Sequence, residues 1–252
     1  MKTLMMFGLI GFCAFNLWAQ AERNVDLIFV GDSITAAKTP AEAAVAALRE
    51  VKGIGDVRCV NTAVSGFTTL NYLPAEGKKE QEIVAALKQF SDQTNTVVIS
   101  VMLGTNDSAF HGPLGSPVSP ADYAKNLSTL IDRWLALNPR TIVVLNMPIW
   151  YSPNTHNRSC YLRDGYERLQ SYFPQIKAVV ATYAQTHPHR VFEGSEKGWG
   201  YFEKTHLETM NHEKGPAGTF FLHPNKKGGE MLGQFWAERM AQILLHEGGL
   251  KY

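Results

Sequence analysis

Short, nearly continuous apolar runs recur along the chain and predict buried strands at residues 25–30, 57–60, 96–103, 141–146 and 190–192. Stretches with helical spacing of apolar residues lie between and after them, at residues 39–51, 78–90, 119–137, 162–186 and 225–245. Strands that alternate with helices form βαβ units, in which a parallel sheet is covered on both faces. The pattern therefore predicts an α/β fold.

Two longer stretches lack a clear period and predict loops. Residues 150–160 are rich in Asn, Ser and Pro, and residues 194–221 are rich in Gly and only weakly periodic. Long loops in a compact domain often carry function, so both are candidates for a functional role.

The first 21 residues have the pattern of a secretory signal peptide. Lys2 precedes an apolar run over residues 4–15, and Ala19 and Ala21 supply small residues before a cleavage site. This run is shorter than the roughly 20 apolar residues of a membrane-spanning helix, and a retained anchor or a buried first helix are the alternatives. We therefore expect a signal peptide at 1–21, a single domain at 22–252, and a periplasmic or secreted bacterial protein.

The charge balance excludes some classes of partner. The chain has 24 Lys and Arg against 23 Asp and Glu, and removal of the leader takes away Lys2, which leaves a neutral mature chain when His is uncharged. A neutral chain has no global field to gather nucleic acid or an anionic membrane, and we expect neither as a partner. Three cysteines are too few for a disulfide scaffold.

A Gly-Asp-Ser sequence, residues Gly31, Asp32 and Ser33, follows the first predicted strand directly. Open parallel sheets bind ligands at the carboxyl ends of their strands, and Gly31 permits a sharp turn that would present Ser33 there. Such a serine becomes a nucleophile when a base takes its proton. On its own, the tripeptide fits a turn with a helix-capping Ser better. Asp32, and Asp107 further along, are expected to accept hydrogen bonds from loop N–H groups.

Three further positions have a comparable placement. Asn106 follows the third strand within Gly104–Asp107, and its amide could donate to an oxyanion. Gly66 follows the second strand and could bring a backbone N–H close to a ligand. His223 lies where a loop meets the last helix and could act as a general base. Each has an ordinary structural alternative: a polar turn, a lone glycine, or a histidine at a helix entrance.

Together and in this order, the four positions resemble the SGNH, or GDSL-type, hydrolase family, with Ser33, Gly66, Asn106 and His223 on its four named residues. The resemblance implies a flavodoxin-like three-layer α/β/α fold whose five-stranded parallel sheet has the order 2-1-3-4-5. It also implies an esterase in which Ser33 attacks the ester carbonyl and His223 takes its proton. The backbone N–H groups of Ser33 and Gly66 and the Asn106 side chain would form the oxyanion hole. No cofactor and no metal are implied.

The chain departs from the family pattern before the histidine. The family usually places an Asp three residues earlier, where this chain has Phe220. An apolar ring cannot orient an imidazole or stabilise its cation. Either the enzyme works as a Ser–His dyad, or a glutamate of the preceding loop substitutes, with Glu203, Glu208 and Glu213 as candidates. We favour the dyad, because none of the three has a short, fixed spacing to His223.

The implied strand order also separates two cysteines. Cys59 lies in the second strand and Cys160 follows the fourth, three strands away, which corresponds to roughly 14 Å at the usual strand spacing. A disulfide requires Cα atoms within about 7 Å. We therefore expect Cys59 and Cys160 to be unpaired.

Aromatic and polar residues gather in the predicted loops, with Trp150, Tyr151 and His111 as candidate substrate-binding residues. Rings mixed with amides and hydroxyls suit sugar faces better than long acyl chains. Together with the leader, they predict a secreted esterase that removes short acyl groups, acetyl above all, from a small-molecule or glycan ester. The alternatives are a lysophospholipase or thioesterase, and a non-catalytic glycan-binding domain on the same fold.

Overall fold

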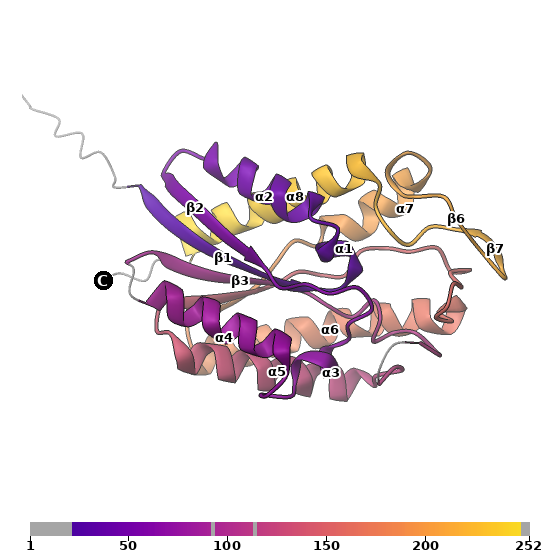
Figure 1. Cartoon of the computed structure of the whole chain (residues 1–252), viewed down its shortest axis with the longest axis horizontal. Helices are drawn as coiled ribbons and strands as arrows, with labels where there is room; N and C mark the ends of the chain where they lie inside the picture. Colours follow the sequence, from indigo (N-terminus) through magenta and orange to yellow (C-terminus); the bar gives the residue numbers. More distant parts are fainter. Residues whose placement is uncertain (1–21, 92–93, 113–114, 248–252) are drawn as a thin grey trace, which may run out of the picture.

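Five parallel strands form the centre of the molecule, in the order β2-β1-β3-β4-β5 (Figure 1). They are β1 (Arg23–Gly31), β2 (Ile54–Asn61), β3 (Thr96–Met102), β4 (Thr141–Leu145) and β5 (Val191–Glu193). This computed structural model describes residues 22–91, 94–112 and 115–247. The predicted leader at 1–21 lies outside the described residues and stays a prediction. The predicted strand order is confirmed.

Helices cover both faces of the sheet, so the fold has three layers, as predicted (Figure 1). They are α1 (Ser33–Ala36), α2 (Thr39–Arg49), α3 (Thr69–Tyr72), α4 (Lys78–Ser91), α5 (Pro120–Leu137), α6 (Leu162–Thr186), α7 (Lys197–Thr209) and α8 (Lys226–Gln242), followed by the π-helical turn η1 (Ile243–Glu247). Among the described helices, none combines the length and the apolar character needed to cross a bilayer.

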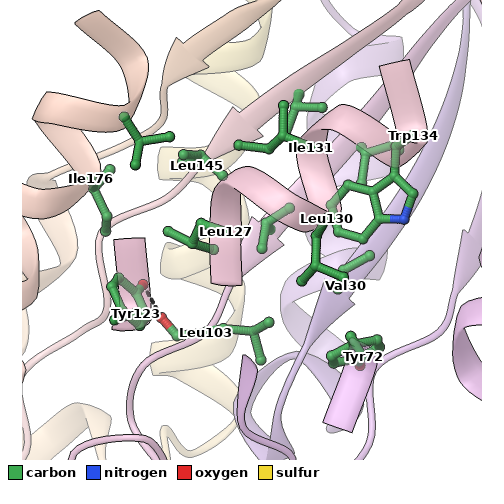
Figure 2. Close-up of a cluster of buried hydrophobic side chains, with 14 of the residues drawn as sticks. Val30, Tyr72, Leu103, Tyr123, Leu127, Leu130, Ile131, Trp134, Leu145 and Ile176 are labelled. Carbon is green, nitrogen blue, oxygen red and sulfur yellow. Dashed lines mark hydrogen bonds between the residues drawn. The ribbon is translucent and has the colours of Figure 1, made fainter. Parts of the chain in front are cut away.

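The alternation of side chains along β1 divides the core in two. Leu27 and Phe29 pack with α2 and α8 on one face, while Ile28 and Val30 pack with α4, α5 and α6 on the other. Because both faces of β1 are covered, its apolar run is nearly continuous instead of alternating with polar residues. Figure 2 shows part of the second cluster, in which Leu130 of α5 lies near Val30.

Helices α2 and α8, which lie far apart in the sequence, approach each other closely. α2 and α8 meet at two glycines of α8. A Cβ atom at Gly233 would lie 2.4 Å from the Pro40 carbonyl oxygen, and one at Gly229 would lie 3.1 Å from the Thr39 side chain. The missing side chains let the helices approach more closely than larger residues allow, so this pair of glycines sets the distance between α2 and α8.

The predicted loop over residues 194–221 is wrong in part, because it contains a helix and a hairpin. Residues Lys197–Thr209 form α7, and β6 (Glu213–Gly215) pairs antiparallel with β7 (Gly218–Phe220). Gly198 indicates a loop in the sequence, but it lies inside α7, where a Cβ would meet Ile149 at 2.7 Å. The glycine therefore permits helix packing at that position.

The two described cysteines are unpaired, as predicted. Cys59 lies on β2 at the edge of the sheet, and Cys160 lies directly before the turn into α6.

Candidate active site

The turn after β1 presents Ser33 at the carboxyl end of the sheet. The Asp32 carboxylate, and not the serine, caps the short helix α1, since its Oδ1 accepts from the Ile34 N–H at 3.0 Å. Gly31 is required by space, because a Cβ there would lie 2.3 Å from Thr35 Oγ1. With capping supplied by Asp32, the hydroxyl of Ser33 is left for another partner.

That partner is His223, from the other end of the chain. Ser33 Oγ and His223 Nε2 lie 2.9 Å apart. The histidine lies two residues before the N-cap of α8, Asn225, whose side chain accepts from the Gly228 N–H at 3.1 Å. The structure thus brings together the two residues that the sequence offered as nucleophile and base, within the hydrogen-bond reach that proton transfer needs.

A carboxylate completes the contact chain, although the sequence favoured a Ser–His dyad. Glu213 Oε1 lies 2.9 Å from His223 Nδ1 and also accepts from the His223 backbone N–H at 3.2 Å. The other two candidate acids are exposed: Glu208 pairs with Lys227 at 2.8 Å, and Glu203 lies on the surface of α7. Of the three glutamates, only Glu213 is placed to orient the imidazole.

The register of the hairpin explains how Glu213 reaches the ring. In the antiparallel β6–β7 pair, Glu213 is directly opposite Phe220, the position where the family usually has its Asp. Side chains of directly opposed residues point to the same face, with Cβ atoms about 5 Å apart. A carboxylate on the longer Glu side chain can therefore serve His223 from the neighbouring strand. Phe220 itself is buried in the core.

The hairpin is held by the loop at 150–160. Asn154 Nδ2 donates to the carbonyl oxygens of Ala217 at 3.2 Å and Thr219 at 2.8 Å. Ser152 exchanges two hydrogen bonds with the Phe221 backbone, at 2.9 and 2.8 Å. These contacts hold β7 and its flanking residues, and β7 in turn pairs with β6, the strand that carries Glu213.

Electrostatics at the histidine favour its cation. Burial of the imidazole opposes protonation, but the hydrogen bond to Glu213, the charge of Glu213 and the charge of Asp32 together raise the pKa of His223 above its ordinary value. A base with a raised pKa accepts a proton from a hydroxyl more readily. The pair of carboxylates therefore suits His223 to hold a proton during a reaction.

The loops after β2 and β3 meet beside these residues. Asn106 Nδ2 donates to the Phe67 carbonyl at 3.0 Å, and Asn106 Oδ1 accepts from the Tyr161 hydroxyl at 2.8 Å. Gly66 has φ +80°, a conformation that favours glycine, and directly precedes Phe67. The hydrogen bond to Phe67 thus joins the segment that contains Gly66 to the segment that contains Asn106.

Two buried carboxylates support these loops, as predicted for acceptors of loop N–H groups. Asp107 accepts from the backbone N–H of Thr69 at 2.9 Å, and Asp32 caps α1. Burial raises the pKa of both to about 6, although their hydrogen bonds act in the opposite direction. Each is the neighbour in the chain of a proposed functional residue, Asp32 of Ser33 and Asp107 of Asn106.

A family model for the GDSL-like lipase/acylhydrolase family matches residues 29–231. The chain belongs to this family. The match begins near the end of β1, includes Ser33 and Asn106 and extends through His223 into α8, so the resemblance seen in the sequence is confirmed. The protein is accordingly a GDSL-like esterase, a hydrolase that acts on esters. A search of curated proteins found no match.

Solved structures of other proteins share the fold of this GDSL-like esterase. A carbohydrate acetylesterase from Sinorhizobium meliloti is 18% identical with a TM-score of 0.57, over 88% of this chain and 100% of that one. An acetylxylan esterase from Geobacillus stearothermophilus is 18% identical with a TM-score of 0.56, over 92% and 97%. A Parabacteroides merdae protein described as a GDSL-like lipase is 14% identical with a TM-score of 0.59, over 88% and 98%. At these identities the likeness shows the fold.

Two of the three substrate-binding residues expected from the sequence are buried in this GDSL-like esterase. Tyr151 is 1% exposed and Trp150 5% exposed, and Trp150 packs against the ring of His206. The expectation for both is therefore wrong, because their rings are covered by the protein itself. His111 is exposed beside Phe110 and stays a prediction.

A small cavity opens beside the proposed nucleophile of this esterase. Its volume is about 190 Å³, and its walls are formed by Ser33, Ile34, Ala37, Thr39, Pro40, Asn211, His223, Pro224, Asn225, Lys226 and Gly229. Ligand sites for drug-sized molecules usually have volumes of about 300–1,000 Å³. The cavity is therefore suited to a small group next to Ser33 and His223.

No motif in the sequence points to two residues that contact these groups. Tyr161 bonds to Asn106 across 55 positions of the chain, and Asn154 bonds to the hairpin across more than 60. Neither lies in a motif or at the end of a predicted strand, so only the folded structure reveals them.

Proposed function

We propose that this protein is a serine esterase that hydrolyses short acyl esters, above all acetyl esters of carbohydrates. The observation that carries the proposal is the unbroken contact chain from Ser33 Oγ through His223 to Glu213, with 2.9 Å at each step. A nucleophile, a base and an acid in this order recur in acyl transfer on unrelated folds.

In the proposed reaction, Ser33 Oγ attacks the ester carbonyl carbon while its proton passes to His223 Nε2. The carbonyl oxygen becomes an oxyanion, held by the backbone N–H groups of Ser33 and Gly66 and by the free N–H of Asn106. Collapse of this intermediate breaks the bond to the alcohol oxygen, which takes the proton from His223. Water then attacks the acyl-enzyme, with His223 again accepting a proton, and releases the carboxylic acid and Ser33.

Glu213 would act through His223 in both steps. Its Oε1 lies 2.9 Å from Nδ1, so it holds the tautomer that leaves Nε2 free to accept from Ser33. Its charge stabilises the imidazolium that forms in each step. The non-catalytic alternative rested on the missing Asp at position 220, and Glu213 removes that reason.

Three observations support a short acyl group on a sugar. The cavity beside Ser33 measures about 190 Å³, which leaves little room for a long acyl chain and disfavours a lysophospholipase. Two structural neighbours are a carbohydrate acetylesterase and an acetylxylan esterase. The leader pattern at residues 1–21 favours a periplasmic or secreted enzyme, where polymeric sugars are accessible.

The decisive experiment measures turnover of p-nitrophenyl acetate, butyrate and octanoate by the wild-type protein and by Ser33→Ala. We expect acetate to be the best substrate, and we expect Ser33→Ala to lower kcat by about 10⁶-fold while the fold is retained. A serine-directed phosphonate should label Ser33 alone. Substantial activity of Ser33→Ala would reject the proposed nucleophile, and a preference for octanoate would favour the lysophospholipase instead.

A further inference from the structure

The amide of Asn106 has a fixed orientation. Its Nδ2 donates to the Phe67 carbonyl at 3.0 Å, and its Oδ1 accepts from the Tyr161 hydroxyl at 2.8 Å. A main-chain carbonyl can only accept, so the Phe67 contact determines which end of the amide is the nitrogen. One of the two Nδ2 hydrogens is thereby used, and the other remains for an oxyanion.

Tyr161 is held rigidly beside this amide. Its side chain is 2% exposed, it lies at the N-terminal boundary of α6, and its ring packs edge-on against Tyr151 with centroids 5.3 Å apart. Burial raises the pKa of Tyr161, and the charge of Asp32 acts in the same direction, so the hydroxyl stays protonated and able to donate.

We propose that Tyr161 is a positioning residue, which orients the Asn106 amide in the oxyanion hole and strengthens it as a donor. An O–H that donates to the amide oxygen draws electron density away from the nitrogen, so the remaining N–H becomes a stronger donor. The same bond restricts rotation of the amide about χ2, a torsion that is otherwise broad. The inference rests on the proposed serine esterase function and adds a residue that acts on the transition state through Asn106.

Tyr161→Phe tests the proposal, because it removes the hydroxyl and keeps the ring. We expect kcat on p-nitrophenyl acetate to fall about tenfold with KM little changed, since the oxyanion exists only after the substrate has bound. Tyr151→Phe is the matched control. Its hydroxyl is also buried and bonds to Ser108 Oγ at 3.0 Å, but not to Asn106, and we expect kcat within about twofold of the wild type.

A second comparison separates positioning from a general loss of structure. In the Asn106→Ala background, Tyr161→Phe should cause no further loss of kcat, because its target is already absent. Titration of Ser33 with the phosphonate gives the fraction of active protein in each variant and corrects kcat for misfolding. An unchanged corrected kcat in Tyr161→Phe, or the same tenfold loss on top of Asn106→Ala, would overturn the proposal. Activity retained in Ser33→Ala would instead reject the esterase mechanism as a whole.

Discussion

The proposed catalytic groups stand on two different kinds of support. Ser33 and Asn106 come within four residues of the ends of β1 and β3, two neighbouring strands that are buried along most of their length. Glu213 stands on a two-stranded hairpin whose strands have three residues each and which lies beyond α1, at one end of the molecule (Figure 1). The first support is part of the core, whereas the second depends on contacts with a loop.

The difference shows how freely each group can be placed. A residue at the end of a buried strand is fixed by the packing of the whole sheet, so its position in the sequence follows from the fold. An isolated two-stranded hairpin is only marginally stable, and its position is set by a few side-chain contacts such as those of Asn154. An acid on either of the two paired strands can therefore lie near His223. The family usually has its Asp at the position of Phe220, and this chain has Glu213 directly opposite that position.

The sharpest test of the hairpin is Glu213→Gln. An amide of the same shape carries no charge and can hold the imidazole in the wrong tautomer, so we expect kcat to fall by about 10⁴. The matched control is Glu208→Gln, which makes the same change at an exposed glutamate paired with Lys227. A loss of kcat smaller than about tenfold in Glu213→Gln would contradict the role of Glu213 and favour a Ser–His dyad.

The same variant has a pH signature with a definite sign. Glu213 raises the pKa of His223, and the histidine must be neutral to accept a proton from Ser33. In the wild type, activity is lost as the pH falls through this raised pKa. In Glu213→Gln that acid limb of kcat/KM should move to lower pH. A limb that stays in place would show that Glu213 does not act on His223.

On the strand-end support, Asn106→Ala removes one oxyanion donor. The expected loss is about 10²–10³ in kcat with KM little changed, because the contact strengthens as the oxyanion forms. Steady-state kinetics on p-nitrophenyl acetate measure both constants. A large rise in KM with kcat preserved would mean that Asn106 binds the ground state of the substrate.

Asn154→Ala addresses the anchor of the hairpin. Loss of its two hydrogen bonds should loosen β7 and with it Glu213, and we expect kcat to fall about tenfold in the wild-type background. Asn157→Ala is the control, since its side chain accepts only within its own loop, from the Ser159 N–H at 2.7 Å. In the Glu213→Gln background the Asn154 effect should vanish, and a loss that persists there would contradict anchoring of the acid.

The last prediction concerns stability and the buried carboxylate of Asp107, which follows Asn106 in the chain, and we expect turnover to change least here. Burial raises the pKa of Asp107 from 3.8 to about 6, so between these values the folded state binds more protons than the unfolded state and stability falls as the pH rises. Asp107→Asn keeps an acceptor for Thr69 and removes the charge. The drop in unfolding free energy between about pH 4 and pH 7 should shrink by about 2–3 kcal/mol, as measured by urea denaturation. An unchanged drop would contradict a raised pKa.

The strand-end half of the site could be predicted from the sequence. Each predicted strand overlaps an observed one, because apolar runs covered on both faces leave a clear signal. Ser33 and Asn106 follow such runs within a few residues. Because the strands are parallel, both residues are expected at the same edge of the sheet, where the strands end. His223 was found by its place before the last helix.

The hairpin half could not be predicted. The strands of β6 and β7 are too short and too exposed to give a period, so the cross-strand position of Glu213 leaves no trace in the sequence. Helix α7 was missed because of its glycines, and Gly198 in fact serves close packing on Ile149. Tyr151 and Trp150 were expected to bind substrate because they lie in a loop with other aromatic and polar residues. Aromatic residues in a loop can also point into the core, as these two do.

The close contact of α2 and α8 at two glycines has a consequence for the chain while it is being synthesised. Ser33 begins α1, which leads into α2, and His223 lies shortly before α8, so the packing of these two helices accompanies a contact of 2.9 Å between residues 190 positions apart in the chain. During synthesis the amino-terminal part emerges first, with its serine exposed but without a base. The proposed nucleophile therefore lacks its proposed base until α8 has been made and has packed against α2.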